Sequence, residues 1–151
     1  MQLSTHEAFM RTALDEAIAA RDAGEVPIGA LVVKDGVIVS KAHNLVESLK
    51  DATAHAELIA LREACAALKE RRLEGCTLYS TLEPCAMCTG AIINSRVERV
   101  VFGAYDERFG CCGSAMSLGD GCLGRRVLVV GGVLEEECTE ILQAFFTSVR
   151  C

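Results

Sequence analysis

The stretches His55-Ala56-Glu57 and Pro84-Cys85-Ala86-Met87-Cys88 decide how this chain is organised, because together they offer one imidazole, two thiols and one carboxylate. A catalytic zinc site takes three protein ligands of these kinds and leaves the fourth tetrahedral position open to water. The carboxylate of Glu57, two residues past the histidine, can carry a proton to and from such a water. We therefore predict a catalytic zinc site. Its expected ligands are His55, Cys85 and Cys88.

The C-x-x-C pair also fits other kinds of site when it is considered alone. A structural zinc site would need a fourth protein ligand and would leave Glu57 without a role. The candidates for that fourth ligand are Cys76, Cys111 and Cys112. A redox protein would form a labile disulfide between the paired cysteines and bind no metal. The two motifs in this order, with a glutamate in the first and a proline opening the second, are typical of zinc-dependent nucleobase deaminases.

Composition places the chain among globular proteins. Its 151 residues are 51% hydrophobic, which allows a buried core, and we expect a single domain over residues 1–151. No N-terminal segment has the pattern of a secretory signal, and no apolar run is long enough to span a bilayer. We therefore expect a cytoplasmic protein without membrane contact. The nine cysteines are an odd number with no evident pairing, which indicates reduced thiols.

Hydrophobic periodicity predicts helices and strands along the whole chain. A first helix has Ser4 as its expected N-cap and ends at Gly24. The dipeptide Asp35-Gly36 between two β-branched runs indicates a hairpin. Strands are expected over residues 27–33, 37–43, 77–81, 97–104 and 127–130, and residues 45–53 form a polar loop. Further helices are expected over residues 53–69 and 134–149. Another is expected to begin at Pro84, and a short one is expected near residues 114–118. This order implies a three-layer α/β domain with helices on both faces of a mixed sheet.

Several stretches resemble the bacterial tRNA-specific adenosine deaminases, a branch of the cytidine deaminase superfamily. The zinc motifs alone fit the wider superfamily, whereas the Pro-Ile-Gly strand start, the Thr-Leu-Glu-Pro-Cys run and the Phe-Phe ending narrow the likeness to the tRNA branch. The likeness covers nearly the whole chain. The stretches that carry it are Val26–Ala30, Thr53–Glu57, Thr81–Cys88, Val101–Ala104 and Gly132–Phe146.

This resemblance implies a cytidine-deaminase-like α/β/α fold with a five-stranded mixed sheet, assembled as a homodimer with one zinc ion per subunit. The implied reaction converts adenosine to inosine at the wobble position of a tRNA anticodon stem-loop, with Glu57 as the proton carrier. The resemblance also implies a set of substrate contacts. These are Asn44, Ala56, Asp106, Phe145 and Phe146.

Other functions fit parts of the same pattern. One is a deaminase of a free base or nucleoside such as guanine or cytidine, and another is a non-catalytic zinc module that binds RNA. Because the net charge is −6, the molecule as a whole does not attract RNA electrostatically. Binding of RNA would therefore require a local patch of basic residues. The family usually has a basic tail after the Phe-Phe pair. Here the segment Thr147–Cys151 has a single basic residue, Arg150, which predicts fewer contacts with RNA phosphates.

Overall fold

Five strands form one mixed sheet in the computed structural model, which describes residues 3–149. The strands are β1 Gly29–Lys34, β2 Val37–His43, β3 Cys76–Leu82, β4 Arg99–Ala104 and β5 Leu128–Val130. The helices are α1 Leu3–Asp22, α2 Val46–Leu49, α3 Ala56–Leu68, α4 Ala86–Asn94 and α5 Glu135–Val149. The strand order is β2-β1-β3-β4-β5, with β1 antiparallel to both of its neighbours and β3, β4 and β5 parallel. The predicted mixed sheet is confirmed.

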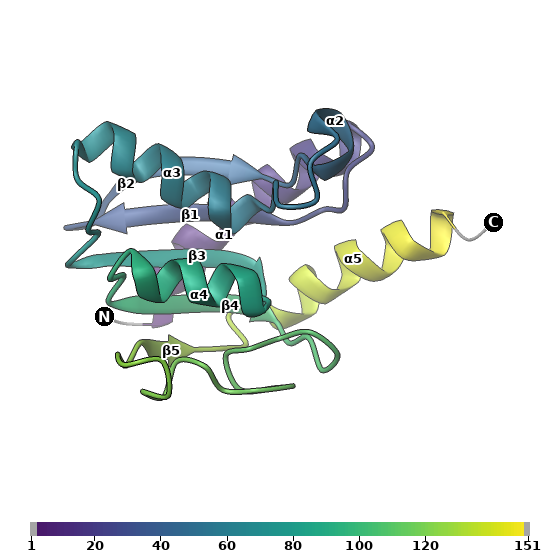
Figure 1. Cartoon of the computed structure of the whole chain (residues 1–151). Coiled ribbons are helices and arrows are strands. Elements are labelled where there is room, and N and C mark those ends of the chain that lie inside the picture. The colour runs from purple at the N-terminus through teal and green to yellow at the C-terminus, as the bar shows by residue number, and fades with distance from the viewer. Residues whose placement is uncertain (1–2, 150–151) are drawn as a thin grey trace.

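Helices cover both faces of this sheet (Figure 1). One core lies beneath α3 and α4 and includes Ala60 and Ile92. The other lies beneath α1 and α5 and includes Met10 and Leu142. Because both faces are covered, β1 and β3 are buried along almost their whole length, which explains why their sequences are nearly uninterrupted apolar runs. The three-layer α/β/α architecture is therefore confirmed.

The hairpin between β1 and β2 has the turn that the sequence predicted. Asp35 and Gly36 have φ angles of 51° and 76°, and two successive positive φ angles are what a type I′ turn requires. The resulting register pairs Gly29 with His43. It also brings Asn44 beside Ile28, whose carbonyl oxygen accepts the Asn44 backbone N–H at 3.1 Å. The turn, together with a register shift between Val32 and Val33, sets where the end of β2 lies relative to the start of β1.

The two ends of α1 differ in how well they were predicted. Ser4 lies within the helix in helical conformation, so its assignment as the N-cap is wrong. The C-terminal prediction is confirmed, because Gly24 follows the helix with φ 81°. The Gly24 N–H bonds the Arg21 carbonyl at 3.0 Å, and the Glu25 N–H bonds the Ala20 carbonyl at 2.9 Å. This pair of hydrogen bonds is the Schellman closure that glycine favours at a helix end.

The helices near the two motifs begin later than predicted. The Thr53 hydroxyl and backbone N–H both bond the Asp51 carboxylate, at 2.7 and 2.8 Å, which forms a turn and delays the start of α3 to Ala56. Pro84 was predicted as the first helical residue of α4 but precedes its N-cap. The loop predicted over residues 45–53 contains α2, and residues 114–118 form turns and a bridge instead of a helix. Among residues 3–149, no helix is long and apolar enough to cross a membrane.

Candidate active site

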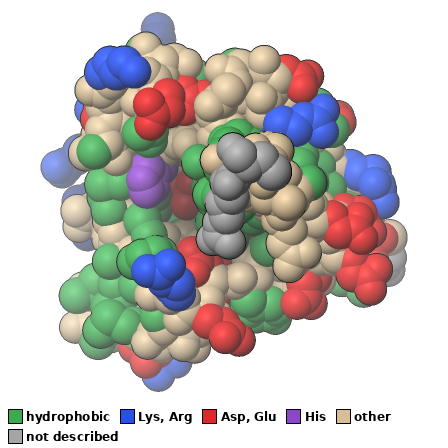
Figure 2. Space-filling view, turned by 90° about the vertical axis from the view of Figure 1, so that its right-hand side faces the viewer, with side chains coloured by type: hydrophobic (Ala, Val, Ile, Leu, Met, Phe, Trp, Pro, Cys, Tyr) green, Lys and Arg blue, Asp and Glu red, His purple; other side chains and the backbone are tan. Residues whose placement is uncertain are grey.

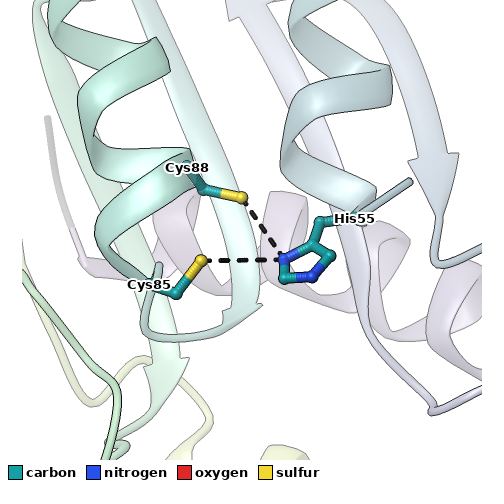
Figure 3. Close-up of side chains that lie close together, drawn as sticks. All are labelled: His55, Cys85 and Cys88. Atoms are coloured by element: carbon teal, nitrogen blue, oxygen red, sulfur yellow. Dashed lines mark hydrogen bonds between the residues drawn. The ribbon is translucent and has the colours of Figure 1, made fainter. Parts of the chain in front are cut away.

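Two helix N-termini carry the predicted metal ligands. His55 is the N-cap of α3, and Cys85 is the N-cap of α4, each with extended backbone. Cys88 lies in the first turn of α4, three residues after Cys85, and therefore on the same side of that helix. Figure 3 shows the imidazole from one helix start facing the two sulfur atoms from the other. Residues 30 or more positions apart in the sequence thus form one cluster.

The spacing of this cluster fits a zinc ion. The His55 Nδ1 atom lies 3.7 Å from the Cys85 Sγ atom and 3.5 Å from the Cys88 Sγ atom. Bond lengths of about 2.3 Å to sulfur and about 2.0 Å to nitrogen place the nitrogen and sulfur corners of a zinc tetrahedron roughly 3.6 Å apart. All three ligand atoms lie within 4.8 Å of one another. The donor set and its spacing are therefore those of a zinc site with three protein ligands.

The pKa values of the Cys85 and Cys88 thiols are shifted in opposite directions. A hydrogen bond from Cys88 lowers the pKa of Cys85 to about 4, against the opposing effect of burial and with support from His55. The same contact, together with burial, raises the pKa of Cys88. The hydrogen bond with Cys85 also raises the pKa of His55. The cluster already favours one thiolate beside the imidazole, and a bound divalent cation would favour the second thiolate as well.

Glu57 lies in the first turn of α3 and is buried, with 4% of its surface exposed. Burial raises the pKa of Glu57 to about 7, although its own backbone N–H and the nearby His55 oppose this change. The carboxyl group also contacts the Cys88 thiol through a hydrogen bond. A carboxyl group with a pKa near neutrality can accept a proton and return it within one reaction cycle.

A cavity of about 360 Å³ opens beside the metal ligands. His55, Glu57 and Cys85 line its metal side. The loop after β4 contributes Asp106 and Phe109 to the opposite wall. One side of the ligand cluster therefore faces a space that a small molecule or a base can enter, as a catalytic zinc site requires.

The cysteines considered as a fourth ligand do not join this cluster. Within residues 3–149, the metal-binding group consists of His55, Cys85 and Cys88. Cys111 and Cys112 are buried in the loop after β4, where the Cys112 thiol contacts the Thr89 hydroxyl at 3.7 Å. The alternative of a closed structural zinc site therefore lacks its fourth cysteine ligand within the described part of the chain.

Two of the substrate contacts implied by resemblance are buried beside residues that line the cavity and are not part of its lining. Asn44 is buried at the end of β2 and bonds Ile28, which lines the cavity. Ala56 is fully buried between His55 and Glu57 at the start of α3.

The other three lie around the loop after β4 and on α5. Asp106 lines the cavity, but its Oδ1 atom accepts the backbone N–H groups of Arg108 and Phe109, both at 3.1 Å. Phe145 is half-buried, whereas Phe146 is 43% exposed. Phe146 lines a second cavity of about 400 Å³, which shares Asp106 and Phe109 with the first. Arg150, the basic residue noted in the tail, lies outside the described residues.

Sequence reasoning missed two residues of the cavity wall. Phe109 is 59% exposed and lines both cavities, and the Arg108 guanidinium lies 4.9 Å from the centre of its ring. Glu83 is almost completely buried and holds the loop after β4 through several hydrogen bonds. A glutamate directly before the Pro-Cys pair was the available signal for Glu83, whereas Phe109 stands in a loop without a recognisable pattern.

Comparisons with known proteins agree with this geometry. Residues 3–104 match the family model described as the cytidine and deoxycytidylate deaminase zinc-binding region. The tRNA-specific adenosine deaminase of Bacillus subtilis is 50% identical to this chain, over 98% of the chain and 92% of that protein. That of Aquifex aeolicus is also 50% identical, over 95% of each.

A solved structure from a study of A-to-I editing by tRNA:A34 deaminases at the wobble position gives a TM-score of 0.85. Its identity to this chain is 42%, and the match covers 89% of this chain and 99% of that chain. A guanine deaminase from Nitrosomonas europaea gives a TM-score of 0.83 at 27% identity, over 93% of this chain and 84% of that chain. The fold is thus shared by deaminases of different substrates, and the sequence is more similar to these tRNA-acting proteins than to the guanine deaminase from Nitrosomonas europaea.

Proposed function

Because the chain belongs to the family of zinc-binding cytidine and deoxycytidylate deaminases, we propose that it hydrolyses adenosine to inosine at the wobble position of a tRNA anticodon. The observation that carries this proposal is the cluster of His55, Cys85 and Cys88, with Glu57 beside it, open to a cavity. The identity of 50% to tRNA-specific adenosine deaminases over nearly the full chain supports the choice of substrate.

The three ligands of the cluster would hold one zinc ion per subunit. A bound zinc ion would supply a Lewis acid that makes a water molecule more acidic. The chain itself supplies the orientation of that site, because the starts of α3 and α4 point the imidazole of His55 and the sulfur atoms of Cys85 and Cys88 toward one another (Figure 3).

Glu57 performs the proton transfers in this proposal. Its carboxylate accepts a proton from the attacking water as the oxygen bonds to C6 of adenine, and it delivers that proton to ring N1. It next accepts the remaining proton of the added oxygen and gives it to the amino nitrogen, which leaves as ammonia when the C6–N bond breaks. One water is consumed and one ammonia released, and Glu57 ends in its starting protonation state.

The base must leave its stack to enter the cavity, and this costs least in a single-stranded loop such as an anticodon. We propose that Asn44, Ala56 and Asp106 contact the base or its ribose. Phe145 and Phe146 would contact neighbouring nucleotides, since aromatic rings offer stacking surfaces to any base. The second cavity, which Phe146 lines, supports this assignment because it shares Asp106 and Phe109 with the first.

Three further parts belong to the proposal. A single catalytic domain over residues 1–151 rests on length and composition, and work in the cytoplasm rests on the sequence pattern. Action as a homodimer rests on the resemblance to the family. Analytical ultracentrifugation tests the dimer: a single species of one-chain mass at micromolar concentration would contradict it.

Substrate choice is tested by comparing a short anticodon hairpin with free adenosine, guanine and cytidine under the same conditions. We expect inosine in the hairpin at the wobble position and little ammonia release from the free compounds. Efficient deamination of free guanine, with an unreactive hairpin, would contradict the proposed substrate while leaving the deaminase chemistry intact.

A further inference from the structure

The loop after β4, residues 105–114, forms one wall of the active-site cavity. It contributes Asp106 and Phe109 to the lining. The loop contains no helix or strand, and the isolated bridge from Cys112 joins it to Ser117, which is not part of the sheet. Its position must therefore come from other contacts, since loop residues that define a binding site need a rigid support.

Glu83 supplies these contacts from the end of β3. Its Oε1 atom accepts the Asp106 backbone N–H at 3.1 Å and the Ser114 hydroxyl at 2.5 Å. Its Oε2 atom accepts the backbone N–H groups of Cys112 and Ser114, at 3.1 and 3.0 Å. The residue is 2% exposed. Both carboxylate oxygens are thus occupied by donors of the loop, so Glu83 has no free group to offer to a substrate.

Two other contacts fit the loop tightly around this carboxylate. The Cys111 backbone N–H bonds the Pro84 carbonyl oxygen at 2.8 Å. Gly110 lies so close to Glu83 that a Cβ atom on it would overlap the carboxyl group. The loop is therefore attached to the segment that immediately precedes the predicted zinc ligand Cys85.

We propose that Glu83 is a positioning residue that holds the 105–114 loop in its substrate-binding arrangement and acts through Asp106 and Phe109. This inference rests on the proposed function for its substrate. It goes beyond that function by assigning a role to a buried carboxylate outside the zinc cluster and the proton-transfer group. It also explains why the position needs a carboxylate, because four donors converge on two oxygens.

The substitution Glu83→Gln tests this role with little change in volume. The amide replaces one oxygen with an NH₂ group, which then faces hydrogen-bond donors and leaves them unsatisfied. We expect backbone amides of residues 105–114 to exchange with deuterium about tenfold faster or more, since removing partners from buried donors frees the loop. Zinc content should stay at the wild-type value because the three ligands are unchanged.

We expect Glu83→Gln to change KM more than kcat. KM for the anticodon hairpin should rise about tenfold while kcat falls less than about threefold, because the loop contributes binding and the zinc site is intact. Ser114→Ala, which removes one of the four hydrogen bonds, should change exchange and KM in the same direction by a smaller factor. This milder variant decides the question if Glu83→Gln does not fold.

Glu25→Gln is a matched control. Glu25 is also fully buried and accepts three hydrogen bonds, but from Glu47 and Ser48 at the start of α2. We expect Glu25→Gln to accelerate deuterium exchange near residues 46–51 and to leave exchange in residues 105–114 unchanged. The proposal is overturned if residues 105–114 exchange with deuterium at the wild-type rate in both Glu83→Gln and Ser114→Ala. It is also overturned if exchange in the loop accelerates while KM for the hairpin stays unchanged. If the wild-type enzyme leaves the hairpin unreacted, the proposed function fails, and the exchange comparison still tests whether Glu83 holds the loop.

Discussion

At the scale of single residues, the proposed proton transfers depend on Glu57. It is buried beside His55 and lines the cavity. Glu57→Gln keeps the shape of the side chain but cannot accept a proton. We expect it to retain zinc and to lower turnover of the anticodon hairpin about a hundredfold or more, the usual effect of losing a general acid–base group. Metal analysis and inosine formation are measured on the same preparation.

Glu63→Gln provides the control for this experiment, because Glu63 lies on the same helix with an exposed side chain. It should leave both zinc content and turnover near the wild-type values. A Glu57→Gln enzyme that keeps more than about a third of wild-type turnover would show that proton transfer does not depend on this residue.

The residues of the site differ in how far the sequence could predict them. His55, Cys85 and Cys88 stand in short patterns whose spacing is set by the chemistry of zinc, and the structure brings them together as expected. The role of Glu83 comes from donors 23 to 31 positions further along the chain. The Glu-Pro-Cys run marks the position of Glu83, but no local pattern encodes contacts at that separation, so the sequence does not predict its hydrogen-bond partners.

At the scale of secondary structure, the predicted zinc ligands come from the starts of both α3 and α4. Removing the metal should leave two facing cysteines without their cation and loosen both helix starts. We expect a chelator to lower the melting temperature by about 5 °C or more in a domain of this size, because a ligand that binds the folded state stabilises it. Calorimetry with and without the chelator measures this difference.

Cys88→Ala should bind less zinc, melt at a lower temperature than the wild type and respond little to the chelator. Cys122→Ser is the matched control, because Cys122 is an exposed thiol outside the cluster, and it should respond as the wild type does. Loss of zinc from the wild type without any change in melting temperature would show that the metal does not support these helices.

The Glu25 carboxylate accepts hydrogen bonds from Glu47 and Ser48 in α2, so we expect its contribution to stability to depend on pH. Burial acts to raise the pKa of Glu25, but hydrogen bonds from Ser48 and Glu47 outweigh it and hold that pKa below its ordinary value of 4.5. A carboxyl group with a lowered pKa in the folded state stabilises the fold above pH 4.5, and this contribution disappears as pH falls through the lowered pKa.

The corresponding experiment compares wild type and Glu25→Gln by urea unfolding from pH 7 down to about pH 3. We expect the wild type to be more stable by about 1–3 kcal/mol at pH 7, and this difference to shrink below pH 4.5. A difference that stays constant across this range would mean that the ionised form of Glu25 does not hold α2.

Elements were predictable where their signals are local. The β1–β2 hairpin follows from Asp35-Gly36, and the end of α1 follows from Gly24. The helix α2 was missed because Glu25, 22 positions earlier in the chain, bonds its first turn. The start of α3 was misplaced because Thr53 bonds Asp51 instead of capping a helix. In these two cases a side chain from outside the element decides its boundary.

At the scale of the whole molecule, charge limits how RNA can bind. The chain has a net charge of −6, and on the face that carries the end of α5, Lys and Arg side chains lie scattered among Asp and Glu (Figure 2). Arg108 lines the second cavity beside Phe146. We expect the slope of log affinity against log salt for the hairpin to be shallower than about −3, as for a few phosphate contacts.

Binding titrations between about 50 and 200 mM salt measure this slope. Arg108→Gln should reduce its magnitude by about 0.7, the value for one phosphate contact on a single strand. Arg21→Gln is the control, because Arg21 lines a groove between α1 and α5 that contains neither Asp106 nor Phe109. A steep slope that Arg108→Gln leaves unchanged would place the main phosphate contacts elsewhere on the molecule.

The central claim is that three side chains from two helix starts bind zinc and leave one side of it open to the cavity. X-ray absorption at the zinc edge of the protein purified with its metal tests this claim most directly. We expect two sulfur neighbours and two lighter neighbours, nitrogen or oxygen, around each zinc ion. Three or four sulfur neighbours would mean that further cysteines close the site, and the hydrolytic function would then be contradicted.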